Sequence, residues 1–235
     1  MNYGIFALVA IVICLAAFPA AGQTPVVLNV PGVEIPPAKL SAADDALIKR
    51  SGLPKVRKKL ISDVCEEAFE PAGVLQGSFS RPNSDQRLVF YQFCQTGNGL
   101  GQVGLILIEN GKIIGNYVAD VGWTVGAASL PDINQNGLNE VALYYSGGMH
   151  QGSGGTGVDV VELSPTGVKG IGWFQAESFS ETGPVIGYRV TAKPGSTPAY
   201  FREKYTQGAN GKWKRSGRVT PFHLQTAISK FVAVK

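Results

Sequence analysis

The segment from Asp132 to Glu140 places oxygen-bearing side chains at positions 1, 3, 5 and 9, with glycine at position 6. In a calcium-binding loop, alternating residues turn their oxygens inward, and glycine permits the sharp turn. The backbone carbonyl at position 7, here Leu138, adds a further ligand. Calcium takes about six to eight hard oxygen ligands, and this loop offers about five or six. The spacing therefore predicts a calcium-binding loop.

The residues from about Ala128 to Tyr145 resemble the FG-GAP repeat, an integrin-type, VCBS-like unit. Its loops read Asp-x-Asp/Asn-x-Asp/Asn-Gly-x-x-Asp between a glycine-containing turn and a hydrophobic strand. The direct match covers under a tenth of the chain, and about half if weaker internal repeats are counted. The resemblance implies blade-like sheets and one calcium ion. Carried over position by position, the implied ligands are the side chains of Asp132, Asn134, Asn136 and Glu140 and the carbonyl of Leu138.

The loop departs from the FG-GAP pattern in ways that weaken it. Two of the four side chains are neutral Asn, so only two formal negative charges remain, and Glu140 replaces the usual Asp. The corresponding earlier loop, Ser80–Asp85, lacks the pattern and has Arg81 where a ligand is expected. We therefore expect a dissociation constant of about 0.1–1 mM. The alternative is an ordinary tight turn, because Asn-Gly pairs and Asp/Asn clusters are common in loops.

Catalytic chemistry has less support. The chain has only two histidines, His150 and His223, which argues against a multi-histidine metal enzyme. Neither a GxSxG nor an HExxH motif is present. We therefore favour a non-enzymatic binding or structural module. The alternative is an exported hydrolase that combines His150 with one of four carboxylates, Asp120, Asp132, Glu140 or Asp159.

Two further patterns have ordinary explanations. The string Gly152–Gly157 satisfies GxGxxG, but a strand-like run follows it where a dinucleotide site needs a helix, so we interpret it as a flexible hairpin connection. A basic cluster could bind an anionic polymer, although acidic residues follow it and a solvated helix face is the default. Its members are Lys49, Arg50, Lys55, Arg57, Lys58 and Lys59.

The first 22 residues are typical of a secretory signal. The apolar run Ile5–Phe18 ends before Pro19, and small residues follow at Ala20–Gly22. Because no Lys or Arg precedes the run, an uncleaved anchor is the alternative. We expect a secreted or periplasmic protein whose mature chain has no membrane span. The net charge of +4 is too small to indicate nucleic acid, which leaves an unidentified protein or polysaccharide as partner.

Two cysteines, Cys65 and Cys94, remain after the signal. An even pair in an exported protein predicts one disulfide. Its loop of about 30 residues would contribute up to about 3.5 kcal/mol. Two buried free thiols are the alternative.

The part before residue 71 is predicted to be a linker and a helical segment. Four prolines within 23–40 favour an extended linker. Within the helical segment at 41–70, Ser41 resembles a helix cap and Ser51-Gly52 a stop at about Arg50. Pro54 then fits the first turn of a second helix over 54–69.

Beyond Pro71 the periodicity predicts β-structure, and a charged fraction of only 16% argues against disorder. The clearest strands are 87–93, 103–108 and 141–145, with turns at 109–112, 165–167 and 209–212. The tail is ambiguous, and 224–231 fits a short helix.

A faint internal repeat relates residues 77–91 to residues 128–144 at an offset of 51–53. We expect a third unit at about 187–222, so that 71–235 forms a β-rich domain of about three blade-like units. Three units are too few for a closed propeller. The expected fold is therefore mainly β, with antiparallel blade-like sheets in a partial propeller or sandwich and an N-terminal helical segment. Ordinary self-similarity of an all-β chain is the alternative explanation of the repeat.

Overall fold

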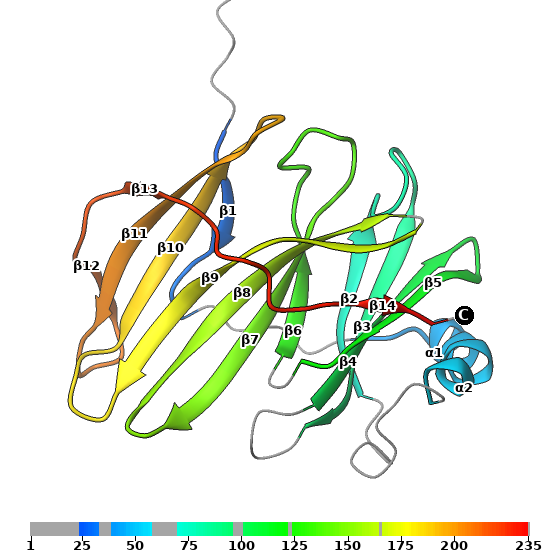
Figure 1. Cartoon of the computed structure of the whole chain (residues 1–235), viewed down its shortest axis with the longest axis horizontal. Coiled ribbons are helices and arrows are strands. Elements are labelled where there is room, and N and C mark those ends of the chain that lie inside the picture. The colour runs from blue at the N-terminus through cyan, green and yellow to red at the C-terminus, as the bar shows by residue number, and fades with distance from the viewer. Residues whose placement is uncertain are drawn as a thin grey trace, which may run out of the picture.

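The computed structural model describes residues 24–32, 39–57, 70–95, 101–121, 124–164 and 166–234. These residues form two antiparallel sheets, one of nine strands and one of five, with a short helical segment against the smaller sheet (Figure 1). The prediction of a mainly β, antiparallel fold with an N-terminal helical segment is confirmed. In the described part of the chain, no helix is long and apolar enough to cross a membrane. The predicted signal at 1–22 and Cys65 lie outside the described residues, so the signal and the Cys65–Cys94 disulfide stay predictions.

The five-stranded sheet has the order β14-β5-β4-β3-β2. Its strands are β2 (Glu70–Gly77), β3 (Gln86–Gln95), β4 (Gly101–Glu109), β5 (Lys112–Ala119) and β14 (Val232–Ala233). The strands predicted at 87–93 and 103–108 lie within β3 and β4. Asn110 and Gly111 join β4 to β5 with φ of 49° and 70°, as expected for the Asn-Gly pair of a tight hairpin.

The helical segment runs through α1 (Ala42–Leu47), the π-helix η1 (Ile48–Gly52) and α2 (Leu53–Arg57). Ser41 caps it as predicted, because its Oγ accepts a hydrogen bond from the Asp44 backbone N–H at 3.1 Å. The predicted stop at Ser51-Gly52 is wrong, since the chain continues through both residues. Gly52 instead lies close to the sheet, where a Cβ would be 3.1 Å from both Ile106 and Ile113. Residues 58–69 of the predicted second helix lie outside the described residues.

The five-stranded sheet is buried on both faces. One face packs against the helical segment, where Ile48 and Val56 share a core with Ile106. The other packs against the larger sheet, where Phe90 of β3 shares a core with Leu143. Burial on both faces explains why the sequence of these strands is continuously apolar instead of alternating.

The nine-stranded sheet has the main order β12-β11-β10-β9-β8-β7-β6. These strands are β6 (Thr124–Ser129), β7 (Val141–His150), β8 (Ser153–Ser164), β9 (Gly167–Ser180), β10 (Ile186–Lys193), β11 (Ala199–Gln207) and β12 (Trp213–Arg215). In addition, β1 (Val26–Asn29) pairs with β10, and β13 (Thr220–Phe222) pairs with β11. The extended linker predicted over 23–40 is therefore wrong at Val26–Asn29, which is part of the sheet. The strands assigned to a third unit at 187–222 continue the same sheet as β6–β9 and form no unit of their own.

The two sheets contain a structural repeat. Strands β2–β5 form a four-stranded antiparallel meander, and β6–β9 repeat it with starting residues 52 to 55 positions later. The predicted repeat at 51–53 is one to three residues out of register with this structural repeat, in which Phe79 and Gln86 correspond to Ile133 and Glu140. Each meander has a loop between its first and second strands, and the 132–140 segment belongs to the second of these loops.

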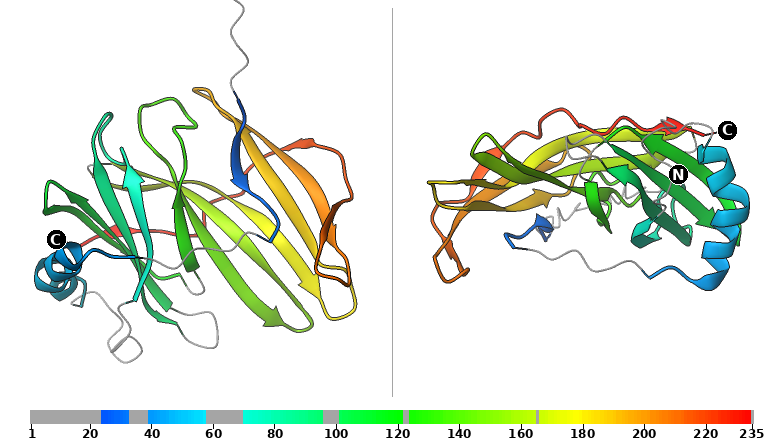
Figure 2. Two further views of the ribbon diagram at one scale, coloured as in Figure 1. Left: turned by 180° about the vertical axis from the view of Figure 1, so that it is seen from behind. Right: turned by 90° about the horizontal axis from the view of Figure 1, so that it is seen from below.

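The chain after β13 crosses the face of the nine-stranded sheet to reach β14 beside β5 (Figure 2). It is not helical at 224–231, where the sequence was compatible with a short helix. Two backbone N–H groups of this segment, those of Ile228 and Ser229, donate to the buried Asp159 carboxylate at 3.0 and 2.6 Å. Asp159 thus fastens the C-terminal segment to β8.

The glycine string at 152–157 is mostly strand. The β7–β8 turn contains only Gln151 and Gly152, and β8 begins at Ser153, so the predicted flexible connection is wrong. The glycines permit close packing against β9. A Cβ on Gly157 would be 2.5 Å from the Trp173 Nε1, and one on Gly155 would be 2.6 Å from a backbone oxygen of β9.

We expect Gly157→Ala to lower the free energy of unfolding by about 1–3 kcal/mol, because the Trp173 ring must shift to admit the methyl group. Gly167→Ala is the matched control, since a Cβ there would have no atom within 4 Å. Urea unfolding of both variants measures the difference. Equal stability of the two variants would contradict the packing role of Gly157.

Candidate functional site

The loop that contains residues 132–140 folds around its own polar side chains. The Asp132 carboxylate accepts hydrogen bonds from the backbone N–H groups of Asn136 and Gly137, at 3.1 and 2.7 Å. The Asn136 Oδ1 accepts one from the Leu138 N–H at 2.9 Å. Gly137 has a φ of 89°, a conformation that favours glycine. Position 6 of the predicted calcium loop is therefore the turn residue that the motif requires.

Glu140 lies beneath this loop and is fully buried. Its carboxylate accepts hydrogen bonds from the backbone N–H groups of Ile133 and Asn134, at 2.9 and 3.3 Å. Burial raises the pKa of Glu140 to about 7, and the nearby Asp132 adds to the increase. The sequence assigned Glu140 to the metal. The structure instead directs its carboxylate to the amides of the loop, so that it holds the loop in place from the protein interior.

A carboxylate that the motif does not contain faces the loop from β8. The side-chain amide nitrogens of Asn134 and Asn136 both donate to the Glu162 Oε2, each at 2.6 Å. Glu162 is next to Val161, which pairs with Val141 at the start of β7. Sequence reasoning missed Glu162 because only the strand pairing brings it to the loop.

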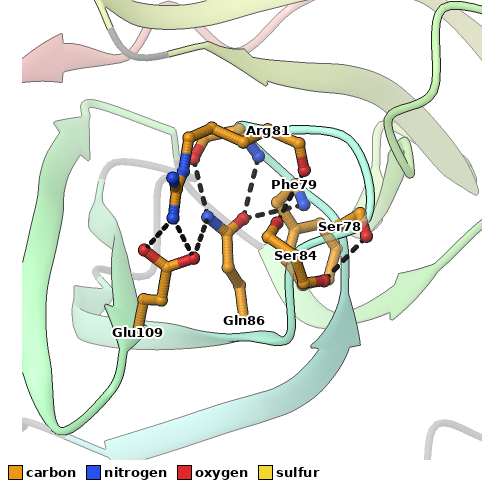
Figure 3. Close-up of polar contacts among 7 residues, drawn as sticks. Ser78, Phe79, Arg81, Ser84, Gln86 and Glu109 are labelled. Atoms are coloured by element: carbon orange, nitrogen blue, oxygen red, sulfur yellow. Dashed lines mark hydrogen bonds and ion pairs between the residues drawn. The ribbon is translucent and has the colours of Figure 1, made fainter.

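The first meander contains a loop of the same design (Figure 3). Gln86 is fully buried, and its Oε1 accepts hydrogen bonds from the backbone N–H groups of Phe79 and Ser80, each at 2.9 Å. These three residues precede Glu140, Ile133 and Asn134 by 54 positions. Each meander thus has one buried side-chain acceptor that binds two successive amides of the loop before its second strand.

The two loops differ in the charge that faces them. In the first, Glu109 pairs with Gln86 in the β3–β4 ladder, and its carboxylate binds the Arg81 guanidinium at 2.6 and 2.5 Å. In the second, Glu162 takes the corresponding place, and no described lysine or arginine forms an ion pair with it. Lys169 lies opposite Glu162 in the β8–β9 ladder but is not bonded to it. The same carboxylate position therefore has a cationic partner in one loop and two amides in the other.

The two loops also contact each other. The Asn139 Oδ1 accepts a hydrogen bond from the Ser78 N–H at 2.7 Å, and the Asn139 N–H donates to the Ser78 carbonyl at 2.8 Å. Gly137 lies against the first loop as well, where a Cβ would be 3.0 Å from the Pro82 ring. The loop with the predicted calcium ligands is therefore supported by its counterpart.

The second loop contains oxygen donors of the kinds that bind calcium, and in this structure those of Asp132, Asn134 and Asn136 accept backbone N–H groups of the loop. Asp132 and Glu162 supply two carboxylates, and Leu138 supplies a backbone carbonyl. To ligate a cation beside Glu162, the Asn134 and Asn136 amides would have to rotate and give up the loop N–H groups that their oxygens accept, at 3.1 and 2.9 Å. Among the described residues there is no cluster of three or more His, Cys, Asp and Glu side chains. A cation here would therefore depend on neutral amide oxygens, which favours weak binding.

The residues of the hydrolase alternative are not brought together. Position 150 ends β7, and Glu140 immediately precedes its first residue, so the ten-residue strand separates them by about 30 Å. Asp159 is buried and binds the backbone N–H groups of the C-terminal segment. Asp120 accepts a hydrogen bond from Gln102. Within the described part of the chain, position 150 is therefore too far from Glu140 to share a catalytic cleft with it.

The basic cluster lies partly within the described residues. Lys49 pairs with Asp45 at 2.8 Å in an exposed i,i+4 ion pair, while Lys58 and Lys59 lie outside the described residues. A role in binding an anionic polymer stays a prediction.

Comparison of the chain with protein-family models, with curated proteins and with solved structures found no match.

The buried Glu140 should make stability depend on pH. Its pKa is raised from 4.5 to about 7, so the folded protein retains a proton that the unfolded chain loses between these values. The free energy of unfolding should therefore fall as the pH rises through this range and level off above it. In Glu140→Gln that slope should disappear, because the neutral amide can accept both N–H groups as Gln86 does.

Urea unfolding between about pH 4.5 and pH 8 measures this effect, and at pH 8 Glu140→Gln should be more stable than the parent by about 1–3 kcal/mol. Glu181→Gln, at an exposed position, is the control and should keep the parent's slope. The same slope in Glu140→Gln as in the parent would show that another group causes it.

Proposed function

We propose that this protein is an exported, non-enzymatic binding or structural module whose second loop binds calcium weakly. The proposed ligands are the side chains of Asp132, Asn134, Asn136 and Glu162 and the carbonyl of Leu138. Glu140 serves as the buried anchor that positions the loop. This set keeps four of the five ligands implied by the FG-GAP resemblance and replaces Glu140 with Glu162.

The observation that carries this proposal is the contrast between the two loops. In the first loop, the Arg81 guanidinium neutralises Glu109. In the second loop, Glu162 lies at the same place in its meander but accepts hydrogen bonds only from the amide nitrogens of Asn134 and Asn136. If those amides rotated, their oxygens would suit a divalent cation. A calcium ion would give Glu162 the positive partner that Glu109 has in Arg81.

Calcium would link the loop to the strand beside it. Asp132, Asn134 and Asn136 precede β7, whereas Glu162 belongs to β8. An ion bound by all four would cross-link the two segments. The expected effect is rigidity at this end of the second meander.

Export of the protein is consistent with a calcium site of such weak affinity. The predicted signal at 1–22 directs the chain to a secreted or periplasmic location. Extracellular calcium modules have dissociation constants of about 0.1–1 mM, which suits a loop with two carboxylates. The tandem four-stranded meanders also support the proposed relation to FG-GAP units, whose blades are antiparallel sheets.

Calcium should raise the melting temperature of the chelator-treated protein. At about 10 mM calcium and a dissociation constant of about 0.1–1 mM, the expected stabilisation is about 1.4–2.7 kcal/mol, which raises the melting temperature by several degrees. Asp132→Asn and Glu162→Gln should each greatly reduce this shift. Differential scanning calorimetry with calcium, with magnesium and with chelator measures the effect.

The matched control is Glu109→Gln, which removes the corresponding carboxylate from the first loop. It should lose stability because Arg81 loses its partner, yet its calcium shift should remain. The proposed site would be contradicted if calcium left the melting temperature of the parent protein unchanged. It would also be contradicted if calcium raised the melting temperature of Glu162→Gln as much as that of the parent.

A further inference from the structure

The nine-stranded sheet opens between β9 and β10. The two strands pair at only two positions, where Glu177 and Ser178 face Gly187 and Ile186. Beyond this point β10 pairs with β1, and β9 is joined at Trp173 by the C-terminal segment. Trp173 and Gln225 exchange two backbone hydrogen bonds, at 2.9 and 2.8 Å. The sheet therefore forks between β9 and β10: β1 lies beside β10, and the C-terminal segment lies beside β9.

A cleft of about 310 Å³ occupies this fork. Its apolar surface includes the buried Phe174 and Val190, and its polar residues lie exposed around them. The lining residues are Trp173, Phe174, Gln175, Val190, Arg202, Phe222, His223 and Gln225. Small-ligand pockets occupy about 300–1,000 Å³, so this cleft suits a ligand of about one ring.

Arg202 gives the cleft its charge. Its guanidinium carbon lies 5.3 Å from the Tyr188 ring centroid and 5.6 Å from the Phe222 ring centroid. These rings restrict the side chain, and no described carboxylate forms an ion pair with it. No Asp or Glu lines the cleft. An exposed, oriented guanidinium without an acidic neighbour favours a planar anionic group such as a carboxylate.

The remaining polar residues favour a ligand with several hydroxyl groups. Gln175 and Gln225 each carry a donor and an acceptor, and His223 adds two ring nitrogens. The C–H face of a pyranose ring can pack on Phe222, as apolar surfaces pack on aromatic rings. Trp173 contributes less ring surface, because its indole nitrogen is buried against Gly157 of β8. A flat aromatic acid would fill the same space but would use none of the hydrogen-bonding groups of these three polar side chains, which would stay bonded to water.

We propose that this fork binds an acidic sugar, a pyranose ring with a carboxylate, as one unit of a polysaccharide. Arg202 binds the carboxylate, the aromatic residues contact the ring, and Gln175, Gln225 and His223 bind its hydroxyl groups. The proposal deepens the proposed binding role by naming a ligand class, and it uses none of the residues assigned to calcium.

The test is a titration of the full mature chain with oligogalacturonate in the presence of excess EDTA, which prevents calcium from bridging the sugar carboxylates. Isothermal calorimetry gives the affinity, and two-dimensional NMR follows the Trp173 indole and the Gln225 side-chain amide. We expect saturable binding that shifts both signals. Arg202→Gln should weaken it by at least about tenfold.

Arg189→Gln is the matched control, because Arg189 is exposed and its neighbour Val190 lines the cleft from the opposite face of β10. Its affinity should stay within about twofold of the parent. The parent should also bind a neutral glucan of the same length at least about tenfold more weakly than oligogalacturonate.

Three results would overturn the proposal. The first is an Arg202→Gln variant that binds oligogalacturonate as the parent does. The second is a preference for benzoate over oligogalacturonate, which would identify an aromatic acid as the ligand. The third is the absence of binding to any of these probes. Because the titration is free of calcium, its outcome does not depend on whether the proposed calcium loop binds its ion.

Discussion

Each four-stranded meander depends on one buried side-chain acceptor that takes up two successive backbone N–H groups. Without a partner, buried N–H groups would destabilise the fold at the point where each meander passes from its first strand to its second. Gln86 meets this requirement in the first meander and Glu140 in the second. The anchors fix the position of both loops, and this position determines which groups on the next strand can face them. The position of the proposed site therefore follows from the requirement that the two N–H groups of each loop have a hydrogen-bond acceptor.

The two meanders satisfy the same requirement with different charges. The first uses a neutral anchor and balances Glu109 with Arg81, so the loop is complete within the chain. The second uses an ionisable anchor, and Asp132 and Glu162 add further negative charge nearby. Asp132 contributes to the raised pKa of Glu140, so a cation bound by Asp132 would oppose that effect and favour the ionised anchor. Metal binding and the protonation of Glu140 are expected to be coupled for this reason.

Local patterns in the sequence predicted the strands and the turn chemistry. Apolar runs bounded by turn residues identified β3, β4 and β7, and the Asn-Gly pair identified the β4–β5 hairpin, because these signals are short-range. Three features that the sequence did not predict depend on tertiary contacts. Gly52 continues the helix because the sheet lies close beneath it, Val26–Asn29 becomes a strand because β10 offers it an edge, and Glu162 reaches the loop only through strand pairing.

The most direct test of the calcium assignment is an amide NMR titration of the metal-free protein with calcium at constant ionic strength. If calcium binds this loop, the amide signals of residues 132–138 and of Glu162 should shift saturably, with a dissociation constant of about 0.1–1 mM. Residues 79–86 of the first loop, where Arg81 already neutralises Glu109, should change far less. Unchanged signals at 132–138 up to about 20 mM calcium, or shifts of equal size in both loops, would contradict the assignment.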